Sequence, residues 1–104
     1  MKNDPILSLL GLSKKAGKIK AGTFQVEDSV KNYKSFLVIC AMDSSDRRKH
    51  DIENMCSFYE VPFMFYGTKE EIGNAIGKPY SAIVSLEDEK LALSIIKKAD
   101  TNSY

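Results

Sequence analysis

The chain has 104 residues, of which 43% are hydrophobic and 28% are charged, and its formal net charge is +1. This length and composition predict one soluble globular domain over residues 1–104 and exclude an intrinsically disordered chain. The longest apolar run, over 36–42, is too short to cross a bilayer, and the N-terminus lacks a secretory signal pattern. We therefore expect a cytoplasmic protein that does not contact membranes.

The first half of the chain predicts two helices and two strands. Asp4 followed by proline is a typical helix start, and the apolar spacing after it predicts a helix over 5–16. A short strand is expected over 18–21, and Thr23 is expected to cap a second helix that ends about nine residues later. Residues 36–42 are branched and aromatic without alternation, which predicts a strand buried on both faces.

The second half predicts the same alternation. A third helix should open at 43–46, with Asp43 capping or beginning it and Ser44 and Ser45 as cap residues, and should stop before Pro62. A strand is expected over 63–66, a fourth helix over 68–77 with a capping box at its start, a strand over 82–86 and a final helix over 87–98. The order αβαβαβαβα predicts an α/β fold in which helices sandwich a partly parallel sheet.

The sequence predicts neither a metal site nor a catalytic centre. Cys40 and Cys56 match no metal or redox spacing, so we expect two reduced core residues. His50 is the only histidine, and the basic residues 47–49 before it are expected to pair with neighbouring acids at helical spacing. We therefore expect that the protein is not an enzyme and binds no cofactor. Residues 101–104 are expected to form a loose tail.

A lysine-rich stretch without any acidic residue lies near the N-terminus. Residues 1–34 carry seven lysines against three acids, a net of +4, whereas residues 35–104 carry eight bases against eleven acids, a net of −3. Four lysines make up the stretch: Lys14, Lys15, Lys18 and Lys20. We expect them to lie close together beside a helix start at Gly22 and Thr23, where free N–H groups would suit phosphate. The stretch indicates nucleic-acid contact, and an ordinary solvated surface is the alternative.

Four segments resemble the ribosomal protein L7Ae/L30e superfamily, and in particular its short bacterial YlxQ-like branch: residues 14–22, 36–43, 59–63 and 75–78. The resemblance extends over roughly residues 6–98. It implies a three-layer α/β/α sandwich with a four-stranded mixed sheet. It also implies a protein that is not an enzyme and that binds structured RNA, kinked or internally looped, with kink-turns as the familiar target and ribosomal RNA among the possible partners.

The resemblance also implies an RNA surface made from three separate places in the chain: Gly22, Thr23, Phe24 and Gln25, then Met42 with its neighbours, then Lys78, Pro79 and Tyr80. Kink-turn binders of the family place Asn and Glu after the Gly-x pair, to contact sheared G·A pairs, and Lys three positions later. This chain has Phe24, Gln25 and Asp28 there. Gln25 can still bond a base edge, whereas Asp28 would repel phosphate, so we expect a related or looser kind of RNA binding.

Several of these residues have a structural role as the alternative. Phe24 is equally typical of a hydrophobic staple or core residue, Tyr80 of a core tyrosine at a strand edge, and Met42 of a residue that fills space at a strand end. For the whole protein, the alternative is a protein–protein adaptor of the same fold that has lost kink-turn recognition. An exposed Phe24 beside Met42 would then anchor the protein interface.

Overall fold

The computed structural model describes residues 4–101, which alternate between helices and strands in the predicted order. The helices are α1 (Pro5–Lys15), α2 (Thr23–Lys31), α3 (Asp46–Tyr59), α4 (Lys69–Ala75) and α5 (Glu89–Thr101). The strands are β1 (Ile19–Ala21), β2 (Leu37–Cys40), β3 (Phe63–Phe65) and β4 (Ile83–Leu86). Of the tail predicted over 101–104, Thr101 belongs to α5 and the other three residues lie outside the described part of the chain.

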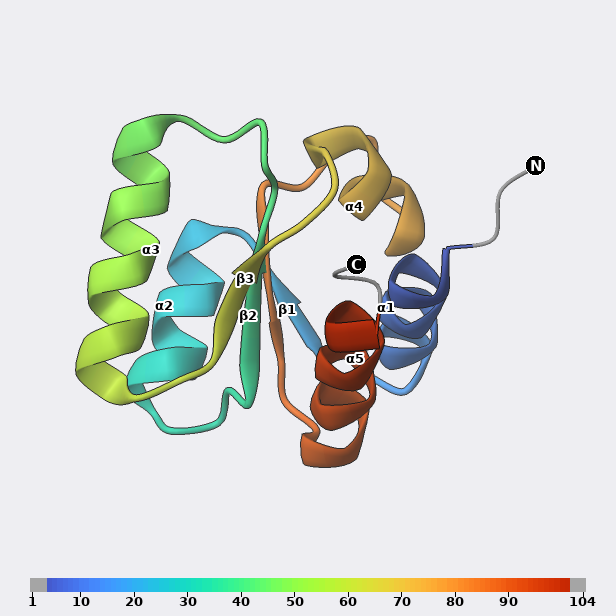
Figure 1. Ribbon diagram of the computed structural model, residues 1–104, viewed down its shortest axis with the longest axis horizontal. Coiled ribbons are helices and arrows are strands. Elements are labelled where there is room, and N and C mark those ends of the chain that lie inside the picture. Colours follow the sequence, from blue (N-terminus) through green and yellow to red (C-terminus); the bar gives the residue numbers. More distant parts are fainter. Residues whose placement is uncertain (1–3, 102–104) are drawn as a thin grey trace.

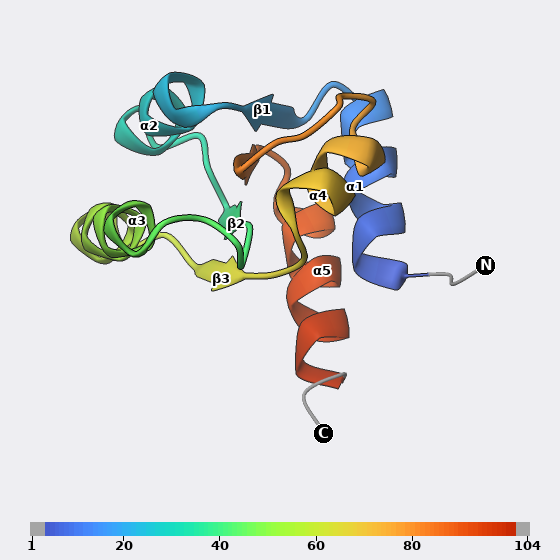
Figure 2. The same ribbon diagram turned by 90° about the horizontal axis from the view of Figure 1, so that it is seen from above.

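The strands form one mixed sheet in the order β1-β4-β2-β3. β2 and β3 are parallel, and helix α3 supplies the crossover that a parallel pair requires, whereas β4 is antiparallel to both β1 and β2. Helices α2 and α3 cover one face of the sheet, and α1, α4 and α5 cover the other (Figures 1 and 2). This arrangement confirms the predicted α/β/α sandwich with a four-stranded mixed sheet.

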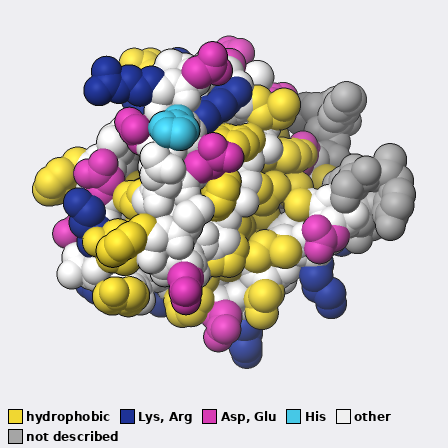
Figure 3. All heavy atoms as spheres, turned by 60° about the vertical axis from the view of Figure 1, so that its left-hand side comes forward, with side chains coloured by type: hydrophobic (Ala, Val, Ile, Leu, Met, Phe, Trp, Pro, Cys, Tyr) yellow, Lys and Arg dark blue, Asp and Glu magenta, His cyan; other side chains and the backbone are white. Residues whose placement is uncertain are grey.

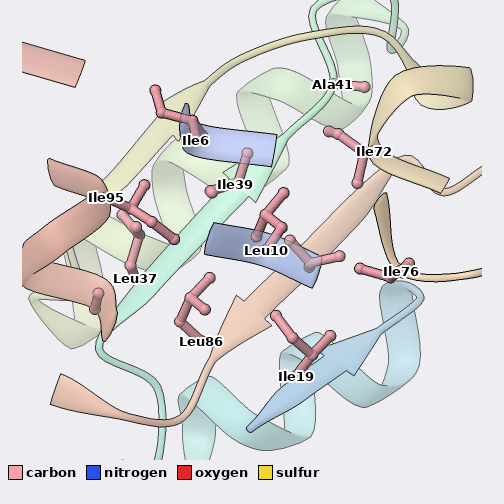
Figure 4. Packing of buried hydrophobic residues seen from close by; sticks show 12 residues of the cluster. Ile6, Leu10, Ile19, Leu37, Ile39, Ala41, Ile72, Ile76, Leu86 and Ile95 are labelled. Carbon is pink, nitrogen blue, oxygen red and sulfur yellow. The ribbon is translucent and has the colours of Figure 1, made fainter. Parts of the chain in front are cut away.

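The sheet separates two hydrophobic clusters. The larger one packs Ile6 and Leu10 of α1, Ile72 of α4 and Ile95 of α5 against the sheet (Figure 4). The smaller one lies between the sheet and α2 and α3, and includes both cysteines. All four residues of β2 are buried, as their unbroken apolar run predicted. Cys40 and Cys56 are free and buried, which confirms their expected place in the core.

Two helix starts follow the sequence prediction. The carboxylate of Asp4 accepts hydrogen bonds from the N–H groups of Ile6 and Leu7, so it caps α1. Thr68 and Glu71 form the expected capping box at α4. Within the described residues, none of the helices combines the length and the apolar character that a membrane span requires.

Two predicted caps were wrong. The N-cap of α2 is Gly22, and Thr23 is the first residue of the helix, because the chain leaves β1 with a positive φ that threonine disfavours. The N-cap of α3 is Ser45, which confirms its expected role as a cap residue, and its hydroxyl accepts from the Arg48 N–H. Asp43 is too far from that helix start. Its carboxylate instead accepts from the N–H of Lys69 at the start of α4 (2.9 Å).

Candidate nucleic-acid interface

Loops from three parts of the chain meet at one end of the sheet, shown at the top of Figure 1. β1 and β2 end there and β4 begins there, because β4 is antiparallel to both. We call this edge the Gly22 surface and define it as residues 22–25, Met42, Arg48 and residues 78–80. The fold therefore brings together the three places that the resemblance implied.

Gly22 makes the turn from β1 into α2. Its φ is +99°, which side chains disfavour, although a Cβ atom there would meet nothing within 4 Å. No side chain caps α2, and its first intrahelical bond runs from the Val26 N–H to the Gly22 carbonyl. The N–H groups of residues 23–25 therefore precede the helical ladder and point outward at the positive end of the helix dipole.

Arg48 joins α3 to this helix start. Its guanidinium donates a hydrogen bond to the Thr23 hydroxyl (Nη1 to Oγ1, 2.5 Å). Arg48 was expected to pair with neighbouring acids at helical spacing, whereas this hydrogen bond runs to a residue of α2. The side chain of Lys49 lies over the ring of Phe65, with Nζ 5.7 Å from the ring centroid. The sequence contained a usable signal for Arg48. It lies in the first turn of the helix that follows a buried strand, and that turn must start at the edge where the strand ends.

Residues 78–80 contribute to the Gly22 surface because the chain passes very close to α4 at Gly73. A Cβ atom on Gly73 would lie 2.3 Å from the Cα of Tyr80, so only glycine permits this approach. The Lys78 N–H donates to the Gly73 carbonyl (2.8 Å), which closes the turn, and the Ser81 N–H donates to the Lys69 carbonyl (2.9 Å). These contacts hold the loop in front of β4.

A hollow of about 240 Å³ lies between these elements. Among its lining residues are Gly22, Thr23, Arg48, Lys78 and Tyr80, and none of the lining residues is acidic. A second hollow of about 260 Å³ shares Thr23 and Arg48, but acidic residues of α2 and α3 line it as well: Glu27 and Asp51. The first hollow therefore suits an anion, because its only formal charges are two cations.

The aromatic and apolar side chains of the Gly22 surface are exposed. Relative exposure is 80% for Phe24, 69% for Tyr80 and 59% for Met42, so their core or staple alternatives were wrong. Gln25, Lys78 and Pro79 are exposed too. The surface thus offers cations, free N–H groups and open ring faces together, a combination that can contact both phosphates and unstacked bases.

The lysine-rich stretch does not gather at this surface. The N–H of Gly22 donates to the Ile83 carbonyl at the start of β4, whereas the carbonyl of Lys18 accepts from the Glu87 N–H beyond its end. Four residues of extended strand separate these points, or about 13 Å. Lys20 lies between them on β1. At the far end, where α1 stops, are Lys14, Lys15 and Lys18, all exposed (Figure 1).

Asp28 and the grouping of possible metal ligands also bear on what this surface can bind. Asp28, where kink-turn binders carry lysine, accepts a hydrogen bond from the side-chain amide of Asn32 at the end of α2 (3.0 Å). Among the described residues, no three His, Cys, Asp or Glu side chains are grouped so that they could hold a metal ion. The groups that the Gly22 surface offers for contact are cations, N–H donors and aromatic rings.

Comparison with known proteins finds relatives of similar length and a solved structure of the same fold. The chain is 28% identical over 92 residues to the RNA-binding protein YlxQ of Bacillus subtilis. This alignment covers 88% of the chain and 92% of YlxQ. The chain is 30% identical over 95 residues to the large ribosomal subunit protein eL8 of Thermoplasma acidophilum, covering 86% of this chain and 78% of eL8. A solved structure of a protein of unknown function from Bacillus halodurans superimposes with a TM-score of 0.91 and 28% identity, covering 94% of this chain and 99% of that one.

The family model described as ribosomal protein L7Ae/L30e/S12e/Gadd45 matches residues 4–95, which is almost all of the described chain. The segments that carried the resemblance, from the end of α1 to the loop after α4, fall within this match. The chain belongs to the ribosomal protein L7Ae/L30e/S12e/Gadd45 family.

Proposed function

We propose that this protein binds structured RNA through the Gly22 surface and is not an enzyme. Its relative YlxQ is an RNA-binding protein, and its family includes ribosomal proteins, which supports RNA as the partner and ribosomal RNA as one candidate. The observation that carries the proposal is the hollow lined by Arg48, Lys78 and Tyr80 at an uncapped helix start. An RNA phosphate would occupy the hollow, and an unpaired base would stack on Tyr80 or Phe24.

The preferred RNA is expected to contain an internal loop, because unpaired bases can leave the stack there and reach an aromatic ring. Standard kink-turn recognition is replaced by a looser form in this proposal. Phe24 offers a ring in place of an amide, and Asp28 carries a negative charge on the second turn of α2. We expect comparable affinity for a kink-turn with sheared G·A pairs and for an internal loop without them. A strong preference for the kink-turn would contradict this part of the proposal.

The test compares charge removal at the two ends of β1. Arg48→Gln and Lys78→Gln remove cations from the hollow, and the matched variants Lys14→Gln and Lys18→Gln remove cations from the far end of the strand. Affinity for an RNA duplex with an internal loop is measured over a range of salt concentrations. Each variant of the first pair should weaken binding and lower the salt slope by about one unit, because one phosphate contact is lost.

The matched pair decides between the hollow and the lysine-rich stretch. If Lys14→Gln and Lys18→Gln weaken binding more than the first pair, the RNA contacts the lysine-rich end and our assignment of the hollow is wrong. If the wild-type protein does not bind the internal-loop RNA, the RNA-binding proposal itself fails. The adaptor alternative then gains support, because exposed Phe24 and Met42 can anchor a protein contact that responds little to salt.

A further inference from the structure

Three aromatic side chains contact one another where α2 and α3 end. The two helices end together at the opposite end of their layer from the Gly22 surface (Figure 1). We call them the Tyr59 cluster: Tyr33, Phe58 and Tyr59. The ring of Tyr59 packs edge to face against both others, with centroid distances of 4.9 Å to Phe58 and 5.9 Å to Tyr33. Phe58 is 78% exposed and Tyr33 is 77% exposed. Figure 3 brings this layer forward and shows hydrophobic side chains exposed at its lower end.

The backbone of Tyr33 is in a conformation that favours glycine. Its φ is +59°, and it follows the C-cap residue Asn32, the position where helices most often end in glycine. Its N–H donates to the Val30 carbonyl (3.1 Å), and the next N–H donates to the Ser29 carbonyl (3.0 Å). Glycine would make the same turn without strain. A large exposed ring at this position is therefore not explained by the turn, which indicates a use for the ring itself.

Two exposed lysines flank Tyr33 of the cluster, and two exposed acids lie on α2 and at the end of α3. Lys31 and Lys34 stand on either side of Tyr33 in the chain, and both are exposed. The nearest acid along α3 is Glu60, directly after Tyr59, and the nearest along α2 is Asp28, whose carboxylate accepts from the Asn32 amide. Lysine is depleted from the cores of protein–protein interfaces, whereas lysine beside open aromatic rings is typical of surfaces that bind single-stranded nucleic acid.

We propose that the Tyr59 cluster is a second RNA contact that stacks unpaired bases, with Lys31 and Lys34 on the flanking phosphates. RNA as the ligand rests on the function proposed above, but the site is separate. The two surfaces lie at opposite ends of α2, a helix of nine residues and about 13 Å, and Glu27 and Asp28 lie on that helix between them. A single strand that flanks the structured element would occupy the cluster.

The test uses fluorescently labelled oligouridine and oligoadenosine of about eight nucleotides, a length that one binding surface can hold. Tyr33→Gly and Phe58→Ala should each weaken oligonucleotide binding roughly tenfold, because each removes one stacked base. Tyr33→Phe should bind normally, since it keeps the ring. Lys31→Gln and Lys34→Gln should each lower the salt slope by about 0.7, the value for one phosphate of a single strand. Leu12→Ala removes an exposed apolar side chain of α1 as the control.

Thermal unfolding separates this role from a structural one. Tyr33→Gly should keep or raise the Tm because it removes the strained φ, while its oligonucleotide affinity falls. A variant that lowers the Tm and leaves affinity unchanged would overturn the proposal, as would failure of the wild-type protein to bind either oligonucleotide. These results would not affect the Gly22 surface, whose test is the internal-loop RNA and the Arg48→Gln variant.

Discussion

Gly73→Ala tests whether close packing beneath Tyr80 shapes the Gly22 surface. The added methyl group would lie 2.3 Å from the Cα of Tyr80 and 2.7 Å from its backbone N and C atoms. All three atoms belong to the backbone, so no side-chain rotation can relieve the contact. To reach an ordinary separation of 3.4 Å, the backbone of Tyr80 must move by about 1 Å.

Two opposing free-energy terms set the expected change in stability. Alanine is favoured over glycine in a helix by about 1 kcal/mol, and overpacking costs about 1–3 kcal/mol, with the upper end expected where backbone must move. We expect a net loss of about 2 kcal/mol in the free energy of unfolding and a fall in Tm of roughly 10 °C. The displaced loop should also weaken binding of internal-loop RNA roughly tenfold, because Tyr80 loses its stacking position.

Urea denaturation and RNA titration of the same samples check both effects. Asn74→Ala is the matched control, because it lies next to Gly73 in α4, is exposed, and should raise stability by a few tenths of a kcal/mol through helix propensity alone. If Gly73→Ala proves as stable as this control and binds RNA normally, then the loop is not held by close packing on α4.

Two further predictions concern stability. The buried Ser85 hydroxyl lies 2.7 Å from that of Ser35, so Ser85→Ala should cost about 1–3 kcal/mol, and urea denaturation should show no such loss for the exposed Ser94→Ala; equal losses would contradict this. Burial raises the pKa of Cys56 from 9.0 to about 11, and burial with a hydrogen bond to Asp4 raises that of Tyr66 from 10.0 to about 12. Because the unfolded chain then loses protons first, the urea midpoint should fall from pH 9 upward, and Cys56→Ala should flatten the fall between pH 9 and 11; an unchanged slope would refute the assignment.

The candidate site was only partly predictable from sequence. Gly22 and residues 78–80 lie where the resemblance implied, and their loops are neighbours because β1, β2 and β4 share one edge. Arg48 was missed because charged neighbours at helical spacing were expected to neutralise it. Its actual partner, Thr23, is 25 residues away in the chain, and no local rule links the two.

The lysine-rich stretch shows that residues close in sequence can lie far apart in space. Lys18 and Gly22 are close in sequence, but an extended strand carries them to opposite ends of the sheet. Closeness along a chain therefore predicts closeness in space for a helix turn better than for a strand.

By itself, the sequence determined the features that depend on neighbouring residues. These are the alternation of helices and strands, the caps at Asp4 and Thr68, and the burial of β2, because hydrophobic period and capping act over a few residues. Only the tertiary structure decided which charges share a hollow and which helix start Asp43 contacts. Those contacts depend on strand order and direction, which bring residues distant in the chain to the same edge of the sheet.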